Sequence, residues 1–372
     1  MKRVVVLMLM LSLMAGIAGA ADTVKIGLMA PLTGAWASEG EDMKQIVELL
    51  AEQINAEGGL LGMPVEILAE DDGGDPKTAA LAAQRLSTRD VVAVIGTYGS
   101  SVTEASQMIY DETPIIQVAN GSTAVRLTEK GLGYFFRTCP RDDEQGRVSA
   151  QTLQAMNAKK IAILHDNTTY SKGLADEAKA LLEEAQLDIV FYDALTPNEN
   201  DYTTILTKLK TAGPDVVFFT GYYPEAGLLL RQKHEMGWDV PFLGGDATNN
   251  PDLVKIAGNE AAAGFYFISP PVPQDLPSEK AKSFLSAFQA KYDADPGSIW
   301  AVLSGDGFLV IAEAIKGADS AKPDAVADYL HKELKDFEGL TGTIAFNDKG
   351  DRVGEVYRVY SVDADGNFVL QE

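Results

Sequence analysis

Short apolar runs alternate with stretches of helical spacing along most of the chain. Residues 24–29 form an apolar run that predicts a first strand. Up to the glycine pair 58–59, apolar side chains then recur at helical spacing, namely Met43, Ile46, Val47, Leu50 and Ile54. Further strands are predicted at 65–68, 91–95, 114–118 and 134–138, with helices at 76–89 and 101–110. This alternation indicates βαβ units with right-handed crossovers, and therefore a mostly parallel sheet covered on both faces.

The same pattern begins again after residue 138. Helices are predicted at 142–156, 173–184, 201–210 and 224–235, and strands at 160–164, 188–192, 215–219 and 241–243. A second doubly wound sheet is therefore expected. The fold class predicted for the whole chain is α/β, with two doubly wound parallel-sheet lobes.

The last hundred residues are harder to assign to either sheet. A strand is predicted at 265–269, and the proline-rich stretch 270–273 interrupts the periodicity as a crossing connection would. Helices at about 277–292, 300–317 and 322–335 fit either lobe. Segments 342–346 and 353–362 are predicted as two strands of a hairpin around the turn 347–350.

The first residues have the features of an export signal. A basic start is followed by an apolar stretch at 4–14 and by small residues up to Ala20 and Ala21. We expect cleavage near Ala20 or Ala21 and a soluble exported protein. A lipid-anchored form would need a cysteine at the cleavage point, and none stands there.

Composition narrows the function classes. The chain has 372 residues, a length that suggests two domains, and a formal net charge of -23. So acidic a surface argues against binding to nucleic acid or to anionic lipid. Cys139 is the only cysteine, so no intrachain disulfide is expected and stability must rest on the hydrophobic core.

The stretch 91–104 has the pattern of a strand, a tight turn and a helix N-terminus. Helix N-termini carry unpaired N–H groups and the positive end of the helix dipole, so this turn can hold an anion such as a carboxylate. Ser100 and Ser101 add hydroxyl donors. In the alternative interpretation Ser101 is only an N-cap, with Glu104 completing a capping box.

Residues that follow the predicted strands form one candidate set, because ligands of open α/β sheets bind beyond the carboxyl ends of the strands. The set is Ser100, Ser101, Gly121, Ser122, Thr123, Asp166, Tyr170, Tyr222, Tyr223 and Asp246. Hydroxyl donors belong to the first lobe, and acids and tyrosines to the second. This distribution suits a zwitterion, although caps and turns alone also place such residues at strand ends.

Sequence signals for catalysis or for a cofactor are weak. The first strand lacks a dinucleotide fingerprint, no phosphate-binding loop occurs, and no cofactor is expected. His165 ends a predicted strand and could act as a general base with a nearby serine, but no Gly-x-Ser-x-Gly elbow accompanies it. The acidic turn 71–76 raises a calcium hypothesis, yet Asp75 and Pro76 fit an N-cap and first helical position better, and no metal site is expected.

Taken together in their order and spacing, several motifs identify a family. They are 26–34, 54–59, 71–76, 95–100, His165-Asp166 with Tyr170, 221–225 and 243–246. The chain resembles the periplasmic leucine/isoleucine/valine-binding proteins of ABC transporters, a type I two-lobed solute-binding fold. The resemblance covers nearly the whole mature chain.

This resemblance implies a division into lobes and a set of ligand contacts. The N-terminal lobe would comprise 22–138 and 270–344 and the C-terminal lobe 139–269 and 345–372, with hinge crossovers near Thr138, Ser269 and Ala345. The ligand carboxylate would be held by Ser100 and Thr123, with the main chain near Gly121, while Asp246, Tyr170 and Tyr222 would surround the ammonium group. The family's small disulfide loop is absent, since Gly74 and Gly99 stand at its cysteine positions.

Two departures from the family affect the side-chain pocket. Asp246 stands where close relatives often have Glu, and Glu39 stands where many have an aromatic residue. A buried charge needs a partner, so Glu39 is expected either to turn to water or to meet a polar or cationic ligand group. Trp36 and Tyr98 could cover an apolar side chain, with Gly99 at the floor of the pocket.

Three functions remain open on the sequence alone. The favoured one is a periplasmic, monomeric, non-enzymatic receptor that closes on a branched-chain or other apolar L-amino acid and presents it to an ABC permease. The second is an exported α/β hydrolase or transferase that uses His165. The third is a ligand-sensing module that acts with a separate partner.

Overall fold

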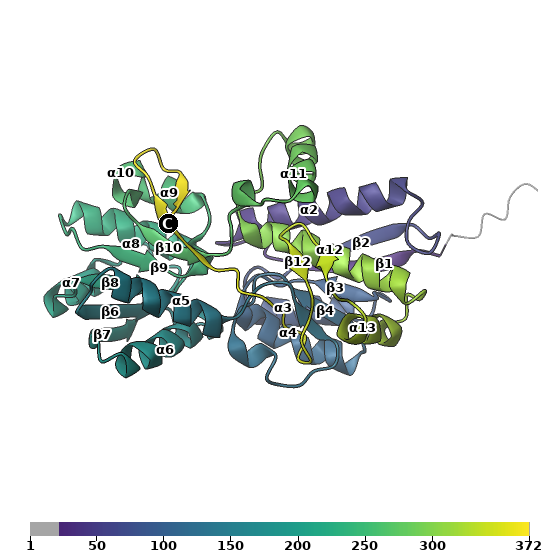
Figure 1. The fold of residues 1–372 in the computed structure, drawn as a ribbon, viewed down its shortest axis with the longest axis horizontal. Helices are drawn as coiled ribbons and strands as arrows, with labels where there is room; N and C mark the ends of the chain where they lie inside the picture. The colour runs from purple at the N-terminus through teal and green to yellow at the C-terminus, as the bar shows by residue number, and fades with distance from the viewer. Residues whose placement is uncertain (1–21, 372) are drawn as a thin grey trace, which may run out of the picture.

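The computed structural model describes residues 22–371, so the predicted signal peptide at 1–21 lies outside the described residues. Two separate sheets dominate the fold (Figure 1). No helix among residues 22–371 is long and apolar enough to cross a lipid bilayer.

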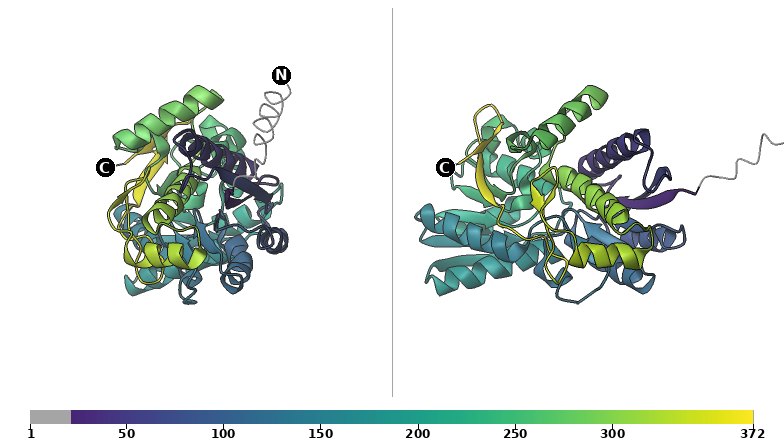
Figure 2. Two further views of the ribbon diagram at one scale, coloured as in Figure 1. Left: turned by 90° about the vertical axis from the view of Figure 1, so that its right-hand side faces the viewer. Right: turned by 45° about the vertical axis from the view of Figure 1, so that its right-hand side comes forward.

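A five-stranded, wholly parallel sheet forms the first lobe. Its strands are, in spatial order, β2 (Val65–Asp71), β1 (Val24–Ala30), β3 (Ala93–Ile95), β4 (Ile116–Ala119) and β5 (Phe135–Arg137). One face packs against α2 (Ala37–Ala56) and α12 (Ile299–Gly317), and the other packs against α3 (Pro76–Leu86) and α4 (Ser100–Glu112). The remaining helices of this lobe are α11 (Glu279–Tyr292) and α13 (Pro323–Lys332). In Figures 1 and 2, α11 projects at the top of the molecule.

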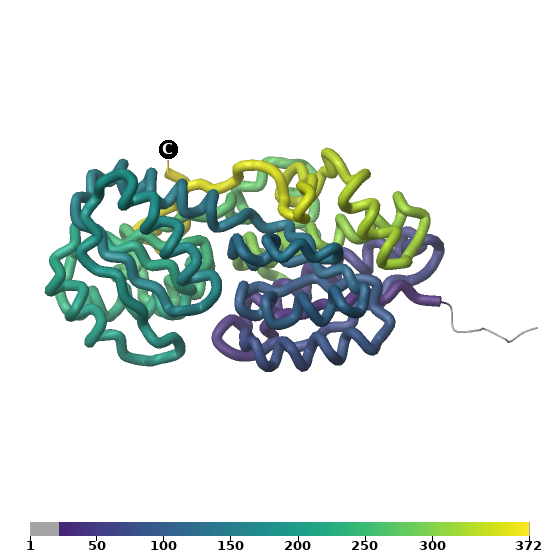
Figure 3. The backbone as a smooth tube through the Cα atoms, turned by 90° about the horizontal axis from the view of Figure 1, so that it is seen from below, coloured from purple at the N-terminus to yellow at the C-terminus, as the bar shows by residue number. Residues whose placement is uncertain are grey.

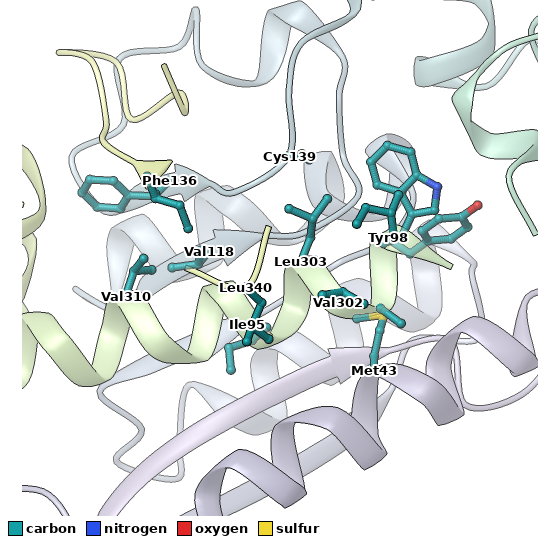
Figure 4. Packing of buried hydrophobic residues seen from close by; sticks show 14 of the residues in the cluster. Met43, Ile95, Tyr98, Val118, Phe136, Cys139, Val302, Leu303, Val310 and Leu340 are labelled. Carbon is teal, nitrogen blue, oxygen red and sulfur yellow. The ribbon is translucent and has the colours of Figure 1, made fainter. Parts of the chain in front are cut away.

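The core of the first lobe lies between the sheet and α12. Figure 4 shows side chains from α12, such as Val302 and Leu303, gathered with Ile95, Val118 and Met43. All five are at most 1 % exposed. The apolar run of the predicted helix at 300–317 is explained by this position, because an almost fully buried helix needs apolar residues on every side.

A seven-stranded sheet forms the second lobe. Its strands are, in spatial order, β14 (Phe368–Leu370), β13 (Arg358–Val362), β10 (Tyr266–Ser269), β9 (Phe242–Gly244), β8 (Val216–Phe219), β6 (Lys160–His165) and β7 (Asp188–Ala194). One face packs against α5 (Asp142–Ala155) and α6 (Thr169–Glu184). The other packs against α7 (Thr203–Ala212), α8 (Tyr223–Glu235), α9 (Asp252–Ala257) and α10 (Asn259–Ala262).

Three chain segments cross between the two lobes. The first joins β5 to α5. The second joins β10 to α11 through the short 3-10 helix η3 (Pro273–Asp275), and the third joins β12 (Thr343–Ile344) to β13. Figure 3 shows the last crossing as the yellow tube that runs between the two bodies. The predicted fold class, two doubly wound parallel-sheet lobes joined by three crossings, is therefore confirmed.

The predicted hairpin at 342–362 forms only at its turn, where the Val353 amide donates to the Ala345 carbonyl oxygen, and the two strands predicted to flank the turn pair with other strands. β12 pairs with β11 (Phe337–Glu338), whereas β13 pairs antiparallel with β10 and β14 in the second sheet. A single antiparallel bridge joins Phe346 to Arg352 around the predicted turn. The tail has to leave one sheet and reach the other, and alternation of apolar residues carries no information about which strands pair.

Candidate functional site

The turn after β3 and the loop after β4 meet at the carboxyl edge of the first sheet, because β3 and β4 are parallel neighbours. A Cβ added to Gly121 would lie 2.8 Å from Cδ2 of Tyr98, so glycine allows the loop to pack directly on the tyrosine ring. The Ala124 amide donates to Oγ of Ser100 at 3.2 Å. Ser100, Gly121 and the neighbouring Thr123 are thus brought together, as predicted.

Unpaired hydrogen-bonding groups collect at this edge. α4 begins at Ser100 with Gly99 as its N-cap, and the first N–H groups of a helix have no acceptor within the helix. Thr123 Oγ1 and the Tyr98 hydroxyl are buried and have no hydrogen-bond partner among residues 22–371. This edge therefore offers donors suited to an anion.

Ser101 does not cap α4, which corrects the alternative interpretation of this turn. Its Oγ accepts a hydrogen bond from the Thr169 amide of the second lobe, at 2.9 Å. Glu104 reaches away from the helix start and pairs with Arg126, with 2.5 Å between Arg126 Nη2 and Glu104 Oε2. The capping-box prediction is wrong because both side chains serve contacts with other segments.

Asp246 lies at the start of the 3-10 helix η2 (Asp246–Thr248), directly after β9. Its carboxylate Oδ2 accepts hydrogen bonds from the Tyr357 hydroxyl at 2.7 Å and from Gln145 Nε2 at 2.8 Å. The side chain is 2 % exposed, and no Lys or Arg side chain pairs with it in the described part of the chain. Burial raises the pKa of Asp246 because it disfavours the charged carboxylate. A bound cation would offset this cost by its attraction to the negative charge.

A second buried carboxylate, Asp142, stands beside Asp246 and was missed by the sequence analysis. Gln145 Nε2 also donates to Asp142 Oδ1 at 2.9 Å, so one amide bridges the two acids. The other oxygen, Asp142 Oδ2, has no partner within 22–371. Burial and the charge of Asp246 both raise the pKa of Asp142. An acidic residue in the first turn of a helix is ordinarily explained by the helix dipole, so the sequence gives no signal for this role.

One contact joins the donor edge to the carboxylate pair. The Asp142 amide donates to the carbonyl oxygen of Thr123 at 3.0 Å. The Thr123 hydroxyl also lies close enough to the Asp142 carboxyl to oppose the rise in its pKa that burial causes, so the two residues are in direct contact across the two lobes. Donors for an anion and acceptors for a cation lie next to each other.

Four aromatic rings from both lobes stack together next to the Asp246 segment. Trp36 lies 4.2 Å from Tyr222 and 5.4 Å from Tyr98, measured between ring centroids, and Tyr170 lies 5.4 Å from Tyr222. Trp36 precedes α2, while Tyr222 precedes α8, so this stack also spans the lobes. The Ala247 amide donates to the Tyr170 hydroxyl at 3.3 Å, which ties Tyr170 to the Asp246 segment.

Glu39 differs from both expectations for it. The side chain is 1 % exposed, so it does not turn to water. Its two carboxylate oxygens accept hydrogen bonds at 2.6 Å from Asn250 Nδ2 and from Ser298 Oγ, so they are occupied by protein groups. Glu39 is therefore an interlobe contact.

His165 forms no Ser–His pair in the described part of the chain. Its Nδ1 accepts from the Asn167 amide at 3.2 Å, and its ring centroid lies 5.1 Å from that of Tyr192. Burial lowers its pKa.

The predicted cap of α3 is confirmed, because Asp75 Oδ1 accepts hydrogen bonds from the amides of Lys77 and Thr78.

Comparisons with known proteins give one consistent family. Residues 23–367 match the model of a periplasmic binding protein family. A leucine-, isoleucine-, valine-, threonine- and alanine-binding protein of Pseudomonas aeruginosa is 36% identical over 92% of this chain and 90% of its own length. A Leu/Ile/Val-binding protein of Rhizobium johnstonii is 34% identical over 94% of both chains.

Solved structures agree with this assignment. A leucine-binding protein from Thermotoga maritima superposes with a TM-score of 0.87 at 27% identity, covering 94% of this chain and 98% of that one. A branched-chain amino acid transporter substrate-binding protein from Streptococcus pneumoniae, solved in complex with isoleucine, gives a TM-score of 0.84 at 31% identity over 94% and 100%. These relatives are named as binding proteins, not as enzymes.

Proposed function

The chain belongs to the periplasmic binding protein family, and from that premise we propose that it captures an L-amino acid between its lobes and delivers it to an ABC transporter permease. The observation that carries the proposal is the contact between Thr123 and Asp142, which sets anion donors beside buried carboxylates. A free amino acid carries its ammonium and carboxylate groups on the same carbon atom. The arrangement therefore fits its backbone.

The ligand carboxylate would lie at the N-terminus of α4. The first amides of the helix, the Ser100 hydroxyl and the unpaired Thr123 hydroxyl supply donors there, and the main chain at Gly121 completes the turn. Charge-assisted hydrogen bonds of this kind are about twice as strong as neutral ones.

The ligand ammonium would lie between Asp246 and Asp142. A buried carboxylate pair without a cation is costly, and one ammonium group can serve both acids. Tyr170 and Tyr222 add a hydroxyl and an aromatic face, which also attract a cation.

The ligand side chain would lie against the aromatic rings. Trp36, Tyr98 and Tyr222 present mostly apolar surface, which favours a branched-chain or other apolar side chain, with Gly99 behind the indole. The relatives named above are described as binding leucine, isoleucine, valine, threonine or alanine.

Capture would use hinge closure. We assign 22–138 and 270–344 to one moving lobe and 139–269 and 345–372 to the other, and we take the observed interlobe contacts to be those of the closed form. Export after cleavage near Ala20 or Ala21, a periplasmic location and a monomeric state complete the proposal. No chemical turnover is proposed.

A ligand panel tests this function. Mass spectrometry of the protein as purified identifies any small molecule that co-purifies. A second sample is unfolded, dialysed free of ligand and refolded, and its Tm is then measured with each common L-amino acid. A ligand at about one hundred times its Kd should stabilise the fold by roughly 2.7 kcal/mol, visible as a higher Tm. If no amino acid changes the Tm, the protein does not bind this class of ligand.

A further inference from the structure

Glu39 is a buried acid that joins the two lobes, and both of its carboxylate oxygens are held by protein groups. Glu39 lies in α2, and its partner Ser298 is the N-cap of α12, which belongs to the same, first lobe. Its other partner, Asn250, lies in the second lobe between η2 and α9. The Asn250–Glu39 hydrogen bond therefore exists only while the lobes are together.

The surroundings of Glu39 contain acids and no compensating cation. Asp42 of its own helix and Asp252 of α9 both face it, and both oppose its negative charge. Lys255, also of α9, is paired with Asp252 at 2.7 Å. The phenols of Tyr98 and Tyr223 are neutral, since burial raises the pKa of each. No ion pair to Glu39 occurs within residues 22–371.

The hydrogen bonds fit a neutral carboxylic acid. Oε1 accepts from Asn250 Nδ2, which can only donate. Ser298 Oγ, the N-cap of α12, can donate a hydrogen bond to Oε2 of the ionised acid or accept one from a protonated Oε2, because a hydroxyl serves in either direction. Burial raises the pKa of Glu39 in this arrangement to about 8. In separated lobes the carboxyl would meet water and ionise in its ordinary range.

We propose that Glu39 binds a proton when the lobes close and releases it when they open, so that ligand capture is coupled to proton uptake. Glu39 acts as a positioning residue, through Asn250, and not as a ligand contact. Because the closed form holds the proton more tightly than the open form, acid favours closure. Ligand affinity should fall as the pH rises from the ordinary range of a glutamate to about 8, by up to about tenfold per pH unit from this group.

The test measures protons taken up on binding, by calorimetry with L-leucine near neutral pH in buffers of different ionisation enthalpy. The variant is Glu39→Gln, whose amide can accept from Asn250 and donate to Ser298 as the neutral acid does. Glu41→Gln is the matched control, the same change at an exposed position of α2. We expect the wild type and Glu41→Gln to take up about one proton more per ligand than Glu39→Gln.

Equal proton uptake in the wild type and Glu39→Gln would overturn the inference. The inference rests on the proposed function in two respects: the lobes must open, and an amino acid must bind so that it can serve as the probe. If no amino acid gives heat, the proposed function fails. The comparison then moves to small-angle scattering of the ligand-free chains between about pH 6 and pH 9, where the wild type should open and Glu39→Gln should not. Identical profiles would then overturn the inference.

Discussion

At the scale of single residues, the centre of the candidate site is the pair of acids that share the Gln145 amide. Asp142 and Asp246 each accept from Gln145 Nε2, and each is almost completely buried. Like charges so placed repel, and burial removes them from the bulk solvent that would screen them. The pair is therefore unfavourable to the empty protein and favourable to a bound ammonium group.

Asp246→Asn should weaken amino acid binding by roughly 2–5 kcal/mol, because it removes a buried partner of the ammonium group. Asp142→Asn should also weaken binding. Asp143→Asn changes the neighbouring, half-exposed carboxylate and serves as the control. Calorimetry with each variant gives the Kd. An affinity unchanged in Asp246→Asn would remove this residue from the site.

Asp142→Asn should stabilise the ligand-free protein, although it weakens ligand binding. Burial and Asp246 raise the pKa of Asp142, so the ionised form destabilises the fold once the pH exceeds the ordinary range of an aspartate. Asp142→Asn should therefore raise the Tm of the ligand-free chain at pH 8 and have little effect near pH 4. A lower Tm at pH 8 would show that the carboxylate is stabilising without a ligand.

At the scale of elements, the indole of Trp36 fills a space that two glycines leave open. A Cβ on Gly74 would lie 2.7 Å from Trp36 Cε3, and a Cβ on Gly99 would lie 2.9 Å from Cζ3. The indole therefore packs against both the β2–α3 turn and the start of α4 and joins the two segments.

Gly99→Ala should destabilise the protein by about 1–3 kcal/mol, because the added methyl group collides with a rigid indole. Urea unfolding measures the loss. In the background Trp36→Phe, whose ring is smaller, the same substitution should cost less. Equal costs in both backgrounds would mean that Trp36 is not the group that Gly99 accommodates.

Most elements could be predicted from the sequence because amphipathic and apolar periodicity is local. The strand ends that carry Ser100, Thr123, Tyr170 and Asp246 follow directly from that pattern. The roles of Ser101 and Asp142 could not be predicted, since each depends on a residue from the other lobe. The partners of β13 likewise depend on where the third crossing leads.

At the scale of the whole molecule, a buried ion pair fastens the third crossing to the candidate site. Arg137 Nε lies 2.6 Å from Asp351 Oδ1, and both side chains are at most 2 % exposed. The same guanidinium donates through Nη1 to the carbonyl oxygens of Ser122 and Ala124, on either side of Thr123. The tail segment therefore helps to hold the loop that would receive the ligand carboxylate.

Asp351→Asn should destabilise the protein by roughly 3–5 kcal/mol near neutral pH, because it leaves Arg137 buried without its counter-ion. Although burial opposes it, Arg137 lowers the pKa of Asp351, so this stabilisation is present above the ordinary range of an aspartate and is lost in acid. Urea unfolding at neutral and at acid pH measures the change. The exposed Asp348→Asn is the control, and an equal loss at both pH values would contradict the ion-pair explanation.

The central claim is that the candidate site between the lobes recognises both charges of an amino acid. Calorimetry of the refolded, ligand-free protein tests it most directly, with L-leucine, with the matching amine that lacks the carboxylate and with the matching acid that lacks the ammonium group. We predict measurable binding of L-leucine, and affinities for the two analogues weaker by on the order of 2–5 kcal/mol. Either analogue binding as tightly as L-leucine would contradict the account.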